Sequence, residues 1–188
     1  MLNTKMLLCY SVLIIITRCL DGYTTYLATP DLSYELNPIV RSFSGNWFLL
    51  LIVGAIFTTL LLMLFFISYR NQDCLFQTSD SLKAYYRQVF KVQKLSSFNF
   101  SYKLLVSKPT IVFLGLSIPI TLGYYSIFLI MNNLFIWGTY RLKAFYNFFL
   151  LIHKFHELII IVVALLVYLI VANNLLRKGY LVCNNLRV

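Results

Sequence analysis

The chain has 188 residues, of which 60% are hydrophobic and only 12% are charged, and its formal net charge is +10. Soluble domains contain roughly 45–50% apolar and 25% charged residues, so this composition excludes an ordinary soluble domain. An excess of Lys and Arg can indicate nucleic acid as a partner. In a chain this apolar the basic residues report membrane topology first, and we expect no nucleic-acid partner.

Four apolar windows are long enough to cross a bilayer, which takes about 20 residues as a helix. They cover about residues 6–27, 47–69, 110–135 and 145–173. The sequence therefore predicts an all-α fold, a polytopic membrane helical bundle of about four transmembrane helices that forms a single integral membrane domain over residues 1–188. No small-residue cleavage site follows the first window, so we expect it to be retained rather than removed as a signal peptide.

Basic residues concentrate in the connection between the second and third windows, residues 70–108. This connection contains Arg70, Lys83, Arg87, Lys91, Lys94, Lys103 and Lys108. The connection after the first window contains only Arg41. By the positive-inside rule, the long basic loop and both termini face the cytoplasm of a multi-pass plasma-membrane protein.

The basic loop includes the segment SDSLKAYYRQVFKVQKL, residues 79–95. Its apolar residues share one helical face, while Lys83, Arg87, Lys91 and Lys94 lie mainly on the other. This pattern is typical of an amphipathic interfacial helix on the inner leaflet, attracted by anionic lipid. The bilayer itself, with anionic inner-leaflet lipid, is therefore an expected partner.

A polar stretch, DGYTTYLATPDLSYELNP, follows the first apolar run and carries three of the six acidic residues. Arg18 and Asp21 are three residues apart, so on a continuing helix they can pair near its outer end. Further along, Thr29-Pro30 and Asn37-Pro38 each join a capping residue to a proline, which predicts a short broken helix after the first span.

Asp21 and Glu35 could meet above the first helix if this stretch folds back. The hydroxyls of Thr24 and Thr25, together with Asn37, would then be candidate ligand-binding groups. Two carboxylates so placed could share a proton, hold a cation or accept hydrogen bonds from a ligand. A solvated loop in which Glu35 points to water is the alternative.

A second cluster, HKFHE, opens the last window and contains His153, His156 and Glu157 on one helical face. Fifteen apolar residues follow it, about 22 Å at 1.5 Å per residue, which places the cluster at the depth of Asp21 and Glu35. These five residues are candidate ligands of a divalent metal such as zinc. Asp21, Glu35, His156 and Glu157 are also candidate catalytic or proton-relay groups, and a structural polar core is the third interpretation.

The motifs DGYTT and ELNP together resemble a D-x-x-T-T and E-x-N-P signature of small bacterial and archaeal membrane proteins, which are grouped only as a domain of unknown function. The resemblance covers about 18 residues and implies a short helical bundle in a prokaryotic plasma membrane. It implies no activity. This chain departs from the pattern in its length, its basic connection and the HKFHE cluster.

Three functions therefore stay open from the sequence. The first is an outer-leaflet site of carboxylates and histidines that binds a metal or ionic ligand, with or without catalysis. The second is a non-catalytic accessory subunit that packs its aromatic-rich helices against other membrane proteins. The third is a small transporter component, in which Pro119 and Gly123 could kink the third span around a path.

Overall fold

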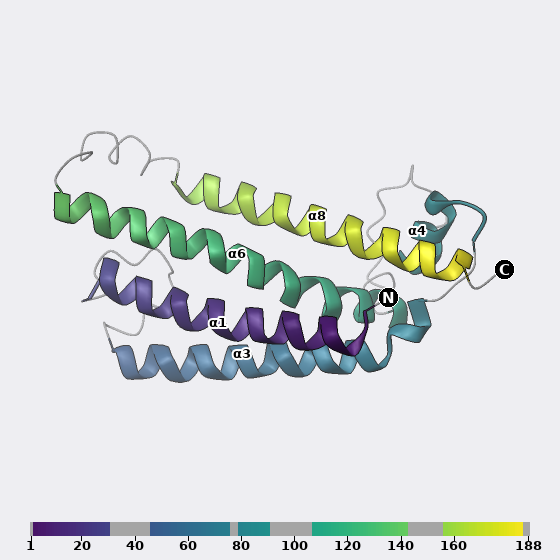
Figure 1. Ribbon diagram of the computed structural model, residues 1–188, viewed down its shortest axis with the longest axis horizontal. Helices are drawn as coiled ribbons and strands as arrows, with labels where there is room; N and C mark the ends of the chain where they lie inside the picture. The colour runs from purple at the N-terminus through teal and green to yellow at the C-terminus, as the bar shows by residue number, and fades with distance from the viewer. Residues whose placement is uncertain (1, 31–45, 76–78, 91–106, 143–155, 186–188) are drawn as a thin grey trace.

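The computed structural model describes residues 2–30, 46–75, 79–90, 107–142 and 156–185 (Figure 1). These residues form only helices: α1 (Thr4–Ala28), α3 (Trp47–Arg70), the 3-10 turn η1 (Gln72–Leu75), α4 (Leu82–Phe90), α6 (Lys108–Leu142) and α8 (His156–Asn185). Four of them, α1, α3, α6 and α8, are long and apolar enough to cross a membrane. The prediction of an all-helical multi-pass membrane protein is confirmed at this level.

The four long helices lie side by side, with α6 between α1 and α8 (Figure 1). The chain alternates in direction, so α1 ends near the start of α3, and α3 ends near the start of α6. We call the end of the bundle that holds the start of α3 the Trp47 end, and the opposite end the Arg70 end. The indole N–H of Trp47 donates to the Pro30 carbonyl at 2.6 Å, which ties α3 to the chain leaving α1.

Two glycines of α6 mark where this central helix approaches its neighbours. A Cβ added to Gly115 would overlap the side chain of Ser68 on α3, and one added to Gly123 would lie 3.3 Å from Ile14 Cγ1 on α1. Helix α6 continues through Pro119, which is buried. Gly123 therefore serves the packing of α1 against α6.

Two helices extend beyond the windows predicted from hydropathy. Helix α6 continues to Leu142, past residue 135, and α8 continues to Asn185, past residue 173. Leu175, Leu176 and Cys183 are buried in the core beyond that predicted end. Helix α8 therefore continues into NNLLRKGYLVCNN, residues 173–185, where polar and basic residues interrupt the apolar run and the buried apolar side chains pack at the Arg70 end. Residues 145–155 of the fourth predicted span lie outside the described residues.

A helix, α4, lies inside the basic loop, whereas the amphipathic interfacial helix predicted over residues 79–95 stays a prediction. Its Tyr85 and Val89 are buried, whereas Lys83 and Arg87 are exposed. The Tyr85 hydroxyl donates to the Leu75 carbonyl at 3.0 Å, so the apolar side of α4 packs on the protein. Contact of its basic side with anionic lipid stays a prediction. Lys91 and Lys94, and the short broken helix predicted after the first span, lie outside the described residues.

Candidate functional site

Helix α1 runs without interruption from its apolar first half through the polar residues to Ala28. This continuity places Arg18 and Asp21 on one face, and Arg18 Nη1 lies 3.3 Å from Asp21 Oδ2. The predicted ion pair is confirmed. Its side chains are only 25% and 18% exposed within the protein, so the pair is largely shielded by neighbouring helices.

The pair lies deeper in the bundle than the end of a helix. The guanidinium carbon of Arg18 is 5.7 Å from the ring centroid of Phe57 on α3. Phe57 is ten residues beyond Trp47, about 15 Å along the helix axis at 1.5 Å per residue. The sequence suggested a pair near the outer end of the first helix, whereas the tertiary contact sets Arg18 near the middle of α3. Charges at such depth are costly unless they are paired.

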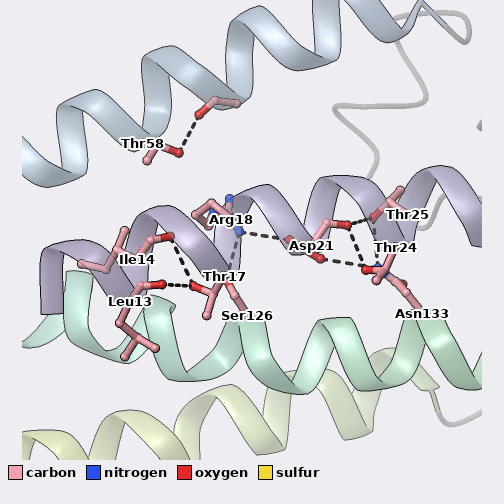
Figure 2. A network of polar contacts seen from close by, with 11 residues as sticks. Leu13, Ile14, Thr17, Arg18, Asp21, Thr24, Thr25, Thr58, Ser126 and Asn133 are labelled. Atoms are coloured by element: carbon pink, nitrogen blue, oxygen red, sulfur yellow. Dashed lines mark hydrogen bonds and ion pairs between the residues drawn. The ribbon is translucent and has the colours of Figure 1, made fainter. Parts of the chain in front are cut away.

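Helix α6 completes the cluster from across the bundle (Figure 2). The Asn133 amide nitrogen lies 3.0 Å from Thr25 Oγ1, 3.3 Å from Thr24 Oγ1 and 3.4 Å from Asp21 Oδ1. One turn of α1 is thereby joined to α6 by a single amide group. Polar contacts between membrane helices of this kind fix how the two helices pack.

The hydroxyl hydrogens of the two threonines are already engaged within α1. Thr24 and Thr25 both donate to the Asp21 carbonyl, at 3.1 and 2.8 Å. Their oxygens can therefore accept from Asn133. A second contact from α6 reaches Arg18, whose Nη1 lies 3.3 Å from Ser126 Oγ.

A groove of about 920 Å³ runs beside this cluster, between α1 and α3. It is lined from Ile15 to Tyr26 on α1 and from Trp47 to Leu62 on α3. Small residues open it, because a Cβ added to Gly22 or Gly54 would meet no atom within 4 Å. Its polar lining consists of Arg18, Cys19, Asp21, Thr25, Thr58 and Thr59, with Tyr23, Tyr26 and Trp47 toward the Trp47 end.

Several predicted site residues cannot be placed relative to this cluster. Glu35, Asn37 and His153 lie outside the described residues, and His156 and Glu157 form the first residues of α8 without a described side-chain position. Within the described residues, no three His, Cys, Asp or Glu side chains gather as a metal would require. The metal hypothesis therefore stays a prediction, and the described part of the site is a hydrogen-bonded ion pair.

Sequence reasoning missed Asn133, Ser126 and Phe57. A signal for the first two was present, since residues seven apart share one helical face, and both are polar in a largely apolar window. Phe57 offered no signal, because α3 carries several aromatic side chains and nothing in the sequence distinguishes this one. Which of its rings meets Arg18 depends on how α1 and α3 pack.

Comparison of the chain with protein-family models, curated proteins and solved structures gives no match. The resemblance to the D-x-x-T-T and E-x-N-P family therefore stays a prediction.

Proposed function

We propose that this chain is a multi-pass plasma-membrane protein that binds a small ligand in the groove between α1 and α3, at a polar site built on Arg18 and Asp21. The proposal rests on one observation. The Arg18–Asp21 ion pair, which neighbouring helices largely shield, lines a groove of about 920 Å³. Small-molecule sites typically have volumes of about 300–1,000 Å³, mostly apolar walls and a few convergent polar groups.

The distribution of charge supports an outward position for the site. Among the residues whose exposure the structure describes, the exposed basic ones gather at the Arg70 end, and they are Lys5, Arg70, Lys83, Arg87, Lys108, Arg177 and Lys178. The positive-inside rule assigns this end to the cytoplasm, so the groove extends inward from the outer face of the membrane. A reporter protein fused after α8 is expected to be active only on the cytoplasmic side. Reporter activity on the outer side would contradict this orientation.

The guanidinium of Arg18 supports binding because its described contacts use few of its donors. Arginine carries five N–H donors in a planar fork. Both of its hydrogen bonds with described residues, to Asp21 and Ser126, start from Nη1. Arg18 also lines the groove, so the rest of the fork can serve a ligand there.

Copurification of a bound small molecule tests whether the groove is a binding site. The protein is purified in mild detergent, and native mass spectrometry compares bound small molecules in the wild type, Gly54→Leu and Gly138→Leu. Both glycines have open space around them, but only Gly54 lines the groove. We expect a bound molecule in the wild type and in Gly138→Leu that Gly54→Leu loses. Equal retention by all three proteins would contradict a site in this groove.

The same preparation tests the metal hypothesis for Asp21, Glu35, His153, His156 and Glu157. Elemental analysis is performed on the wild type and on Glu35→Gln and His156→Ala. A stoichiometric metal that both substitutions remove would establish the metal site predicted from the sequence. A metal-free protein that still carries a small molecule in its groove would leave the Arg18–Asp21 site as the functional one.

A further inference from the structure

The charge balance of the groove restricts what it can hold. Arg18 and Asp21 are the only charged residues in its lining among the described residues, and they neutralise each other at 3.3 Å. A net charge brought to this depth would stay without a counter-charge in a medium of low dielectric constant, which is strongly unfavourable. An uncharged ligand avoids that cost.

The groove offers hydrogen-bond donors on one residue and hydrogen-bond acceptors on two others. Arg18 offers N–H donors, as described above. Thr58 and Thr59 line the groove and donate their hydroxyl hydrogens to the Gly54 and Ala55 carbonyls at 2.8 Å, so their hydroxyl oxygens keep only the role of acceptors. A carbonyl oxygen of a ligand can accept from Arg18, and a hydroxyl group can donate to a threonine.

The depth of these groups excludes an ordinary phospholipid head. Arg18 lies beside Phe57, about 15 Å along α3 from Trp47, an aromatic residue of the type that marks the membrane interface. A phospholipid keeps its head group at that interface. A ligand that uses Arg18 must carry its polar group inside the hydrocarbon layer.

We infer that the groove holds an uncharged amphiphile with a carbonyl group at mid-membrane depth and a long apolar tail. Acylglycerols and isoprenoid quinones share this chemistry. The inference rests on the proposed function, since it names the ligand class of the same groove. The ligand enters sideways from the bilayer, with its carbonyl oxygen on the Arg18 fork and its tail along the apolar walls of α1 and α3.

The fluorescence of Trp47 provides a direct assay, because Trp47 lines the groove. The chain has two tryptophans, so Trp137→Phe leaves Trp47 as the only one. The protein is placed in lipid nanodiscs and titrated with a benzoquinone that carries a ten-carbon tail and quenches indole fluorescence. Monooleoylglycerol and ionised oleate are then added as competitors, the first uncharged and the second anionic.

We expect saturable quenching that monooleoylglycerol relieves and oleate does not. Gly54→Leu should raise the half-saturating quinone concentration at least tenfold, and Gly138→Leu should leave it unchanged. Arg18→Lys keeps the charge but removes the fork of donors, so it should weaken both uncharged probes. Thr58→Val should weaken only monooleoylglycerol, the probe that has hydroxyl groups to donate.

The outcomes separate the two levels of the proposal. Saturable quenching that monooleoylglycerol fails to relieve identifies the quinone as the source of the carbonyl chemistry, whereas tight competition by monooleoylglycerol with weak quinone binding identifies the acylglycerol. If oleate binds more tightly than both uncharged probes and Gly54→Leu blocks it, the ligand class is wrong but the binding site stands. If Gly54→Leu alters the binding of no probe, both the ligand class and the proposed function are refuted.

Discussion

Replacement of Asn133 by Leu tests whether the contact between α1 and α6 stabilises the bundle. The Asn133 amide has two N–H groups and three acceptors, at 3.0, 3.3 and 3.4 Å, so it makes at most two hydrogen bonds at a time. Hydrogen bonds between membrane helices contribute on average about 0.6 kcal/mol, with a maximum near 1.7 kcal/mol. Two such bonds, one of them to a carboxylate, give an expected loss of about 2 kcal/mol.

The assay is thermal unfolding in detergent. For a chain of this size, a loss of 1 kcal/mol lowers Tm by roughly 2–4 °C, so we expect Asn133→Leu to lower Tm by about 4–8 °C. Met131→Leu is the matched control, because Met131 lies on the same helix and is 63% exposed. If Asn133→Leu unfolds at the temperature of Met131→Leu, the contact contributes nothing. In an Asp21→Asn background the loss should be smaller, because the two side chains are coupled.

Three further predictions concern packing and the Arg70 end. Gly115→Ala should destabilise the protein by about 1–3 kcal/mol in the same unfolding assay, because the new methyl overlaps Ser68. Ser68→Gly in the same chain should restore part of this loss, and Gly138→Ala should cost nothing; an equal effect at both glycines would contradict the close approach of α6 to α3. Tyr85→Phe should cost about 1 kcal/mol, because it removes the buried hydrogen bond to the Leu75 carbonyl; an unchanged Tm would show that this bond contributes nothing. Burial raises the pKa of the Tyr85 phenol. The stability that the neutral Tyr85 phenol contributes is therefore complete below the usual phenol pKa of about 10 and is lost at higher pH. From pH 9 upward, the Tm of the wild type should fall more steeply than the Tm of Tyr85→Phe.

Local sequence patterns were sufficient for features that one helix contains. The Arg18–Asp21 pair was predictable because side chains three residues apart share a helical face whatever surrounds them. For α4, the spacing of apolar and basic residues predicted a helix in the basic loop, and its place on the inner leaflet stays a prediction. What α4 would pack against was not predictable. Its apolar side meets the bundle, where the Tyr85 hydroxyl donates to the Leu75 carbonyl of η1 and the Tyr85 ring lies 6.1 Å from the ring of Tyr180 on α8.

Depth was predicted less well, because hydropathy averages over a window. The apolar window of the first span ends near residue 27, which left Arg18 and Asp21 close to a boundary. In the structure the Arg18 guanidinium lies beside Phe57, which belongs to another helix. In the same way, α8 extends past its apolar window because packing buries Leu175 and Leu176 there.

The sequence by itself determined that the chain is an all-helical, multi-pass membrane protein with four long apolar helices and basic residues concentrated in one connection. These properties depend on composition and on the spacing of residues within single helices. Only the tertiary structure decided that Asn133 and Ser126 of α6 complete the Arg18–Asp21 cluster, and that a groove beside it separates α1 from α3. The reason is physical: apolar helices in lipid offer no hydrophobic preference for one neighbour over another, so their arrangement depends on close approach at small residues such as Gly123 and on a few polar contacts.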